Sequence, residues 1–265
     1  MNAPSSAPGP TFLATDGIHN FRDYGGYATQ GGGRVRAGLL FRSGQHVEAS
    51  EADLQTFAEL GIRTVIDLRG NAERERHPCR RPDLWDGYVV FYDGETSSRP
   101  PHEPEQPIEL TAETAHGRML KVYTRMPHNE PMQTIFGQYL RALAERDGAS
   151  LVHCFAGKDR TGIAAALLHH ILGVSRADML EEFLRTNDAP TYDILERQSL
   201  PGIEARLGGP LDRDAVAELM QVREPYYQRF METVREGWGS LDSFLDRAIG
   251  VDDTLREQLQ ARFVA

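Results

Sequence analysis

The segment His153–Gly162, with the sequence HCFAGKDRTG, constrains the fold of this 265-residue chain more than any other. It follows a short apolar run over residues 150–152, which favours a strand, and leads into small and apolar residues up to 172, which are typical of a buried helix. The sequence therefore predicts a strand, a tight loop and a helix in direct succession, as in α/β proteins.

Other hydrophobic patterns extend this α/β prediction along the chain. The predicted strands lie over residues 34–43, 62–68 and 88–92, and the predicted helices over 50–60, 111–125, 132–146 and 241–264 (two helices). Residues 93–107 are polar and proline-rich, which indicates a long exposed loop. We expect a central, mostly parallel sheet flanked by helices.

The C-terminal half adds a long helical stretch to that sheet. Residues 175–238 are helical in pattern, with breaks expected at Pro190, Pro201 and residues 208–210. We interpret this stretch as a helical lid inserted in a single domain over residues 13–265. Residues 1–12 are predicted to form a disordered tail.

Composition excludes several classes of protein. The net charge of -10 argues against a nucleic-acid partner, which normally meets a basic face. No apolar run approaches the roughly 20 residues that span a bilayer, so we expect no integral membrane association. The two cysteines are too few for a disulfide scaffold or a four-cysteine zinc site, which favours a reduced, cytoplasmic protein. Nothing in the sequence indicates the oligomeric state.

Cys154 and Arg160 lie six positions apart at the turn from strand to helix, a spacing that can wrap one phosphate. The backbone N–H groups between them can point inward, and the helix N-terminus adds partial positive charge. Glycines at 157 and 162 let the backbone approach closely. The planar guanidinium of Arg160 can hold two phosphate oxygens at once.

The same positive field is expected to favour the thiolate of Cys154, which is the nucleophilic form. Thr161 can donate its hydroxyl to that thiolate, which would attack phosphorus and give a thiophosphate intermediate. No metal and no cofactor is expected, because Arg160 and the amides carry the charge. The expected substrate-binding residues are Phe155, Ala156, Gly157, Lys158 and Thr161.

The segment HCFAGKDRTG resembles the P-loop of the atypical bacterial protein tyrosine phosphatase family, which is related to lipid and protein phosphatases. We use the name P-loop for residues 153–162. Four further segments are similar to that family in the expected order: NFRDYGG at 20–26, GLLFRSGQ at 38–45, VIDLRGNAERE at 65–75 and GSLDSFLDRAIGV at 239–251.

The resemblance implies a tyrosine-phosphatase-like fold, with Cys154 as nucleophile and Arg160 as phosphate clamp. Lys158 and Asp159 match the Lys-Asp pair of the family, which implies a range wider than phosphotyrosine, including phosphoserine, phosphothreonine and phosphoinositides. In the family, helices such as those predicted over 175–238 cover the pocket. A second cation such as Lys158 suits an extra phosphate on an inositol ring.

Three aspartates compete for the role of general acid, which must lie within hydrogen-bond reach of the leaving oxygen. Asp159 lies within the P-loop and is the acid implied by the resemblance. Asp93 opens a long loop after a strand, and Asp67 ends a central strand. A carboxylate beside Cys154 would oppose thiolate formation unless Lys158 or Arg160 offsets it.

Several neighbouring residues are given mainly structural roles. His153 is expected to anchor the P-loop, and Arg22 and Asp23 to pair with each other or brace it. Cys79 is either an inert surface thiol or the partner of Cys154 in a protective disulfide. The basic residues over 74–77 and 80–81 are expected to form a solvated face.

These observations favour a cysteine-dependent phosphatase acting on phosphotyrosine in proteins. The alternatives are a phosphoinositide phosphatase with little protein activity, a non-catalytic phosphate-binding module, and a thiol-redox role such as arsenate reduction. A redox role needs a resolving cysteine close to Cys154, and Cys79 is the one candidate.

Overall fold

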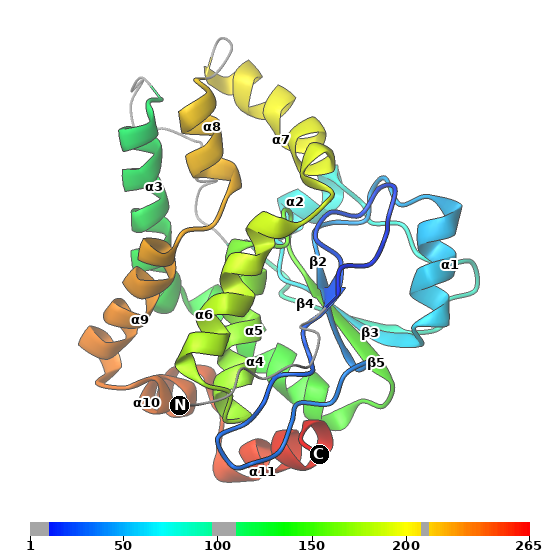
Figure 1. Cartoon of the computed structure of the whole chain (residues 1–265), viewed down its shortest axis with the longest axis vertical. Helices are drawn as coiled ribbons and strands as arrows, with labels where there is room; N and C mark the ends of the chain where they lie inside the picture. The colour runs from blue at the N-terminus through cyan, green and yellow to red at the C-terminus, as the bar shows by residue number, and fades with distance from the viewer. Residues whose placement is uncertain (1–10, 97–109, 208–211) are drawn as a thin grey trace, which may run out of the picture.

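The computed structural model describes residues 11–96, 110–207 and 212–265, and its centre is a five-stranded sheet (Figure 1). The strands are β1 (Arg22–Asp23), β2 (Leu40–Ser43), β3 (Ile62–Asp67), β4 (Tyr88–Phe91) and β5 (Ala149–His153). Their spatial order is β1-β2-β5-β3-β4; β1 is antiparallel to β2, and the other neighbours are parallel. The predicted central, mostly parallel sheet is confirmed.

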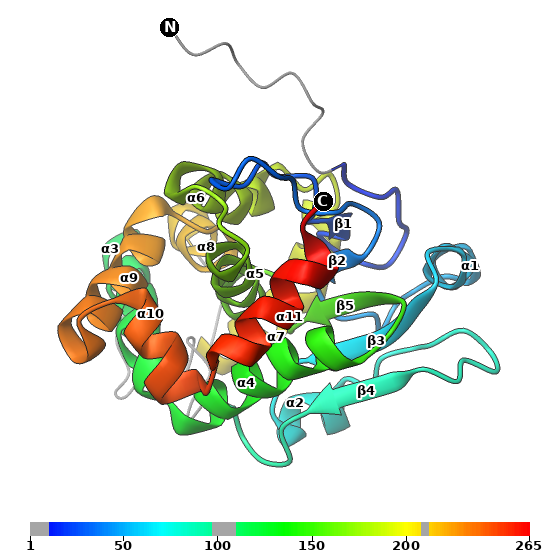
Figure 2. The same ribbon diagram turned by 90° about the horizontal axis from the view of Figure 1, so that it is seen from below.

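Helices cover both faces of this sheet (Figure 2). Those that precede β5 are α1 (Glu51–Glu59), α2 (Asn71–Arg76), α3 (Ala112–Arg125), the 3-10 turn η1 (Met126–His128) and α4 (Glu130–Glu145). Those that follow β5 are α5 (Asp159–Ile171), α6 (Arg176–Leu184), η2 (Arg185–Asp188), α7 (Tyr192–Leu207), α8 (Arg213–Met220), α9 (Glu224–Trp238), α10 (Leu241–Phe244), the π-helical turn η3 (Leu245–Ile249) and α11 (Asp253–Phe263).

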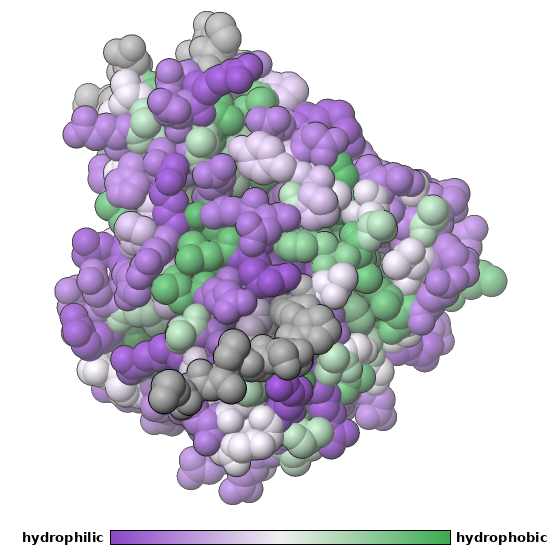
Figure 3. Space-filling view, in the orientation of Figure 1, coloured by the Kyte–Doolittle hydropathy of each residue, from purple (hydrophilic) through white to green (hydrophobic). Residues whose placement is uncertain are grey.

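Two apolar clusters hold the layers together. Leu54 and Phe57 of α1 pack with Phe41, Val65 and Leu151 of the strands on one face. A larger cluster on the other face joins the sheet to α3, α4, α5 and the helices beyond. Every residue of β5 is buried, as expected for the central strand of a parallel sheet covered on both faces. The outer face in Figure 3 is mainly hydrophilic, with hydrophobic side chains in smaller patches.

The helices over 176–238 follow the predicted helical stretch, but one predicted break is wrong. Pro201 lies inside α7, and the helix continues past it to Leu207. The strand predicted over 34–43 is also shorter in the structure, where it is β2 over Leu40–Ser43. Residues 34–39 contribute only isolated bridges at Arg34 and Val35, because Gly38 has a φ of +79° that interrupts extended backbone. No helix of the described residues is long and apolar enough to cross a membrane.

Two further predictions fall partly outside the described ranges. Residues 1–10 of the predicted tail are among those not described, whereas Phe12 forms an isolated bridge with Arg22. The predicted loop over 93–107 is described only as far as residue 96.

The sheet positions the candidate site through its strand ends. In the parallel register, Ser43 of β2 and Asp67 of β3 each lie beside His153 of β5. The loops after these three strands therefore start at one edge of the sheet. This is the edge where open parallel sheets place their ligand sites, at the carboxyl ends of the strands.

Candidate active site

The P-loop begins at the end of β5 and ends in the first turn of α5. Gly157 has a φ of +66°, and a Cβ there would lie 2.4 Å from the backbone of Ser43. A Cβ on Gly162 would lie 2.7 Å from the ring of Phe183. Both glycines are therefore needed for the loop to sit this close to β2 and α6.

The carbonyl oxygen of Gly157 is held by two buried side chains. Asn20 Nδ2 and Arg42 Nη2 each donate to it over 2.8 Å. Arg42 is fully buried and comes from β2, directly beside β5. These bonds occupy the lone pairs of an oxygen that would otherwise repel a phosphate, and they fix the curvature of the loop.

A buried charge cluster supports these donors. Glu182 of α6 contacts Arg22 at 2.9 Å and Arg42 at 3.0 Å, and all three side chains are at most 2% exposed. Burial raises the pKa of Glu182, but the two guanidinium charges outweigh it and leave the pKa below its ordinary value. The expected pair between Arg22 and Asp23 is not formed; Asp23 instead accepts from the backbone of Gly25.

The P-loop opens into a cavity of about 720 Å³. Six residues singled out by the sequence line it: Cys154, Phe155, Ala156, Lys158, Asp159 and Arg160. The walls are largely apolar and include four of the seven methionines: Met119, Met126, Met132 and Met220. Leu195 and Ile203 of α7 and Leu219 of α8 complete the apolar lining. The helices of the predicted lid over 175–238 thus form part of the cavity wall.

Arg160 is held by a carboxylate that the sequence analysis did not single out. Its Nη1 and Nη2 donate to the two oxygens of Glu73 over 2.6 and 2.8 Å. Burial opposes charge on both groups, but their mutual attraction dominates: it lowers the pKa of Glu73 and raises that of Arg160. The pair fixes the plane of the guanidinium at the cavity wall.

Asp159 is the only one of the three candidate acids among the described residues that line the cavity. Its Oδ1 accepts from the Tyr123 hydroxyl over 2.6 Å, and Lys158 Nζ lies 3.0 Å away. Asp67 is instead bound by Arg69 over 2.9 and 2.7 Å, and Asp93 is an exposed partner of Asn71.

Lys158 is almost completely buried at the cavity wall. It is 5% exposed, and besides Asp159 its ammonium donates to the carbonyl of Gln221 over 3.4 Å. The ammonium therefore offsets the charge of Asp159 next to Cys154. Thr161 Oγ1 is buried and has no hydrogen-bond partner among the described residues, which leaves its hydroxyl available to a thiolate.

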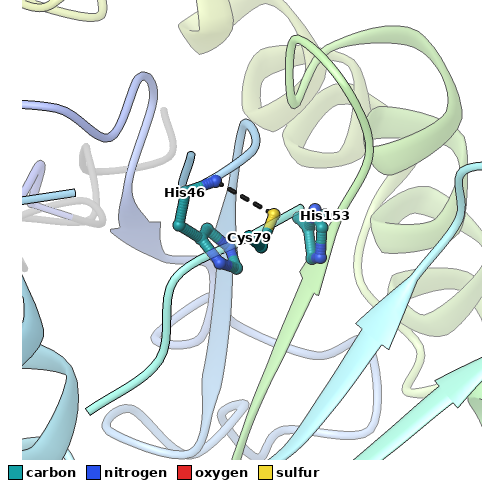
Figure 4. Close-up of side chains that lie close together, drawn as sticks. All are labelled: His46, Cys79 and His153. Carbon is teal, nitrogen blue, oxygen red and sulfur yellow. Dashed lines mark hydrogen bonds between the residues drawn. The ribbon is translucent and has the colours of Figure 1, made fainter. Parts of the chain in front are cut away.

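His153 directly precedes Cys154, and its ring contacts that of His46 (Figure 4). Its Nδ1 lies 3.1 Å from the Cys154 carbonyl, and its Nε2 lies 3.5 Å from Asp67 Oδ2. Burial holds the pKa of His153 well below its ordinary value, so the ring is neutral. A neutral imidazole donating from Nδ1 suits the anchoring role expected of His153.

His46, Cys79 and His153 bring one donor atom each to within 4.8 Å of one another (Figure 4). Their donor types would suit Zn²⁺. However, Arg69 Nη2 donates to the Cys79 sulfur over 3.2 Å, and Arg81 Nη1 lies 2.8 Å from His46 Nδ1. These guanidinium groups would repel a cation, and metal-free chemistry stays our prediction.

Neither cysteine is part of a disulfide. The sulfur of Cys79 also accepts a hydrogen bond from the His46 backbone N–H over 3.3 Å. Cys79 is half-buried, and its two predicted roles, an inert surface thiol and the partner of Cys154 in a disulfide, both stay predictions.

The basic run over 74–77 is not a purely solvated face. Arg74 donates to the Tyr92 carbonyl over 3.0 Å and stacks on Phe91, whereas Arg76 and His77 line the cavity.

The sequence analysis did not single out Tyr123, which donates a hydrogen bond to Asp159. In the sequence, Tyr123 is one tyrosine on the inward face of a predicted helix, and that pattern is equally typical of a residue that only packs in the core.

Taken together, the fold and the cavity around the P-loop define a phosphatase active site of the tyrosine-phosphatase type. Comparison of the sequence with known families agrees. The chain belongs to the tyrosine phosphatase family, whose sequence model matches residues 13–265.

Individual relatives support the assignment over most of the chain. A Cupriavidus necator protein named as a tyrosine-protein phosphatase is 34% identical, covering 99% of this chain and 92% of that protein. The triple specificity protein phosphatase PtpB of Mycobacterium tuberculosis is 29% identical, covering 86% of this chain and 91% of that protein. Among solved structures, P. aeruginosa TpbA has 16% identity and a TM-score of 0.33, covering 87% of this chain and 99% of that one, a likeness too low to add support.

Proposed function

We propose that the protein is a cysteine-dependent phosphatase that hydrolyses phosphotyrosine in proteins. The observation that carries the proposal is that Cys154, Asp159 and Arg160 line one cavity whose walls are largely apolar. An aryl phosphate places its ring against such walls and its phosphate in the P-loop.

In the proposed mechanism, the thiolate of Cys154 attacks phosphorus and the bond from phosphorus to the leaving oxygen breaks. Arg160 and the backbone N–H groups of the P-loop stabilise the charge on the equatorial oxygens. Asp159 gives its proton to the leaving oxygen. The resulting thiophosphate is attacked by water, whose proton returns to Asp159, and phosphate and the thiolate are released.

We extend the proposal to phosphoserine, phosphothreonine and phosphoinositides as secondary substrates. The Lys-Asp pair of the P-loop supports this, as does the similarity to a relative named for triple specificity. A phosphoinositide phosphatase with little protein activity is less well supported, because the ammonium of Lys158 is already engaged by Asp159 and Gln221. A cytoplasmic location, proposed from cysteine usage, accompanies this function.

The proposal is tested by phosphate release near pH 6 with a chelator present. A phosphotyrosine peptide, a phosphoserine peptide and a soluble monophosphorylated phosphoinositide are compared, with Cys154→Ser as the blank. We expect the phosphotyrosine peptide to have the highest kcat/KM and the variant to lose turnover while still binding phosphate. Turnover that persists in Cys154→Ser would refute the covalent mechanism.

A further inference from the structure

Tyr123 contacts both the P-loop and two helices of the predicted lid, α6 and α9. It lies on α3, is fully buried, and donates its hydroxyl to Asp159 Oδ1 over 2.6 Å. Its ring stacks on Tyr226 of α9 at 5.6 Å with an interplanar angle of 20°, and meets the edge of Phe183 of α6 at 6.1 Å. Packing from two helices therefore holds the hydroxyl in one place.

The charged surroundings of Asp159 come from several elements. Lys158 precedes it at the start of α5, with Nζ 3.0 Å from Oδ1 and from Oδ2, and Arg160 follows it. Cys154 lines the same cavity, and Tyr226 of α9 adds a phenol hydroxyl nearby. Among these groups, Tyr123 donates a hydrogen bond to Asp159 from a hydroxyl, whereas Lys158 donates from a charged ammonium.

The donor role of Tyr123 does not change over the working pH range. Burial, and then the adjacent Asp159 carboxylate, raise the pKa of Tyr123 well above its ordinary value. The hydroxyl keeps its proton and therefore stays a donor toward the Asp159 carboxylate. A hydrogen bond of this kind stabilises the ionised carboxylate more than the protonated acid.

We propose that Tyr123 is a positioning residue for proton transfer by Asp159. Because Oδ1 is occupied by the Tyr123 hydroxyl, the transferable proton is directed to Oδ2, from which it passes to the leaving oxygen as the bond to phosphorus breaks. The same bond favours the return of Asp159 to its ionised form. This inference rests on the proposed function, and it assigns to α3 a part in the chemistry.

The test compares Tyr123→Phe with the wild type. The substitution keeps the ring and its stacking but removes the donor. Tyr139→Phe is the matched control, because Tyr139 is also fully buried and its hydroxyl bonds another tyrosine, Tyr24, over 2.8 Å. Circular dichroism and thermal unfolding check that both variants fold.

The measurement is the pH dependence of kcat between pH 5 and 9 with two aryl phosphates. Phenyl phosphate has a poor leaving group that needs a proton, whereas p-nitrophenyl phosphate has a good one. In Tyr123→Phe we expect the basic limb with phenyl phosphate to move to higher pH, because the carboxylate loses a donor that favours its ionised form. Tyr139→Phe is expected to keep the wild-type limb, and p-nitrophenyl phosphate to show the smaller change in rate.

Two outcomes would contradict the inference. A uniform loss of kcat with an unmoved limb would make Tyr123 a packing residue only. Movement of the acidic limb instead would mean that Asp159 works as a carboxylate and not as a proton donor. Absence of turnover in the wild type, or turnover that persists in Cys154→Ser, would instead remove the proposed function, and the two failures are therefore distinguishable.

Discussion

Replacing Glu73 by Gln tests whether the ion pair with Arg160 serves catalysis. The carboxylate of Glu73 accepts from both Nη atoms of Arg160, and Glu73 also accepts from the Gly70 backbone N–H over 3.3 Å. Glutamine has the same shape but no charge, and it turns an NH₂ group toward the guanidinium. The guanidinium then loses the two parallel bonds that fix its plane.

The expected size of the effect follows from the geometry of the pair. A hydrogen bond to a charged group contributes about 1.5–3 kcal/mol. The side chains of Arg160 and Glu73 are 17% and 23% exposed, so solvent screens them in part, and we assign that range to the pair as a whole. If the loss falls on the transition state, kcat/KM decreases roughly 10- to 160-fold.

The assay is steady-state hydrolysis of a phosphotyrosine peptide by wild type, Glu73→Gln and Glu75→Gln. Glu75 is an exposed residue of the same helix and controls for the change in net charge. We expect Glu75→Gln to stay within about twofold of wild type. Equal or faster turnover in Glu73→Gln would show that Glu73 competes with phosphate for Arg160, which would refute the positioning role.

Three further predictions concern the scaffold. Glu182→Gln leaves two buried guanidinium groups without their counter-charge and should lower the free energy of unfolding in urea by about 3–5 kcal/mol, whereas Glu181→Gln, which is exposed, should change it little; similar values for both would contradict the cluster's role. Gly157→Ala should reduce kcat/KM at least tenfold, because its Cβ would meet backbone at 2.4 Å, and unchanged kinetics would mean the loop can shift freely. His46 and His153 are buried with pKa values well below normal; since the unfolded chain binds protons below about pH 6.5, stability should fall between pH 7.5 and 5.5, and a flat urea midpoint would refute this.

Local pattern predicts those parts of the fold whose stabilising contacts are short in sequence. The helices at 112–125 and 130–145 lie within two residues of their predicted bounds, because apolar periodicity and capping residues such as Thr111 act locally. Pro201 shows the opposite case. Proline disfavours a helix interior, yet α7 continues through Pro201, and Leu195 and Ile203 on either side of it lie in the larger apolar cluster.

The candidate site likewise has parts that the sequence predicts and parts that it does not. The P-loop residues are contiguous, so their common cavity could be predicted from spacing alone. The partners of Arg22 and Arg160 could not, because Glu182 and Glu73 lie 160 and 87 residues away in a chain with 39 acidic residues. The register of β3 and β5 brings the segments of Glu73 and Arg160 to one edge of the sheet, whereas Glu182 reaches Arg22 from α6.

The proline inside α7 also has a mechanical consequence. Pro201 has no backbone N–H to donate to the carbonyl of Arg197, so one hydrogen bond of the helix is missing at that turn. Gly202 follows directly, and it lines the cavity together with Ser199 and Gln198. We therefore expect α7 to bend more easily in the stretch that borders the cavity, so that a bulky substrate can be accommodated at a lower elastic cost than an unbroken helix would impose.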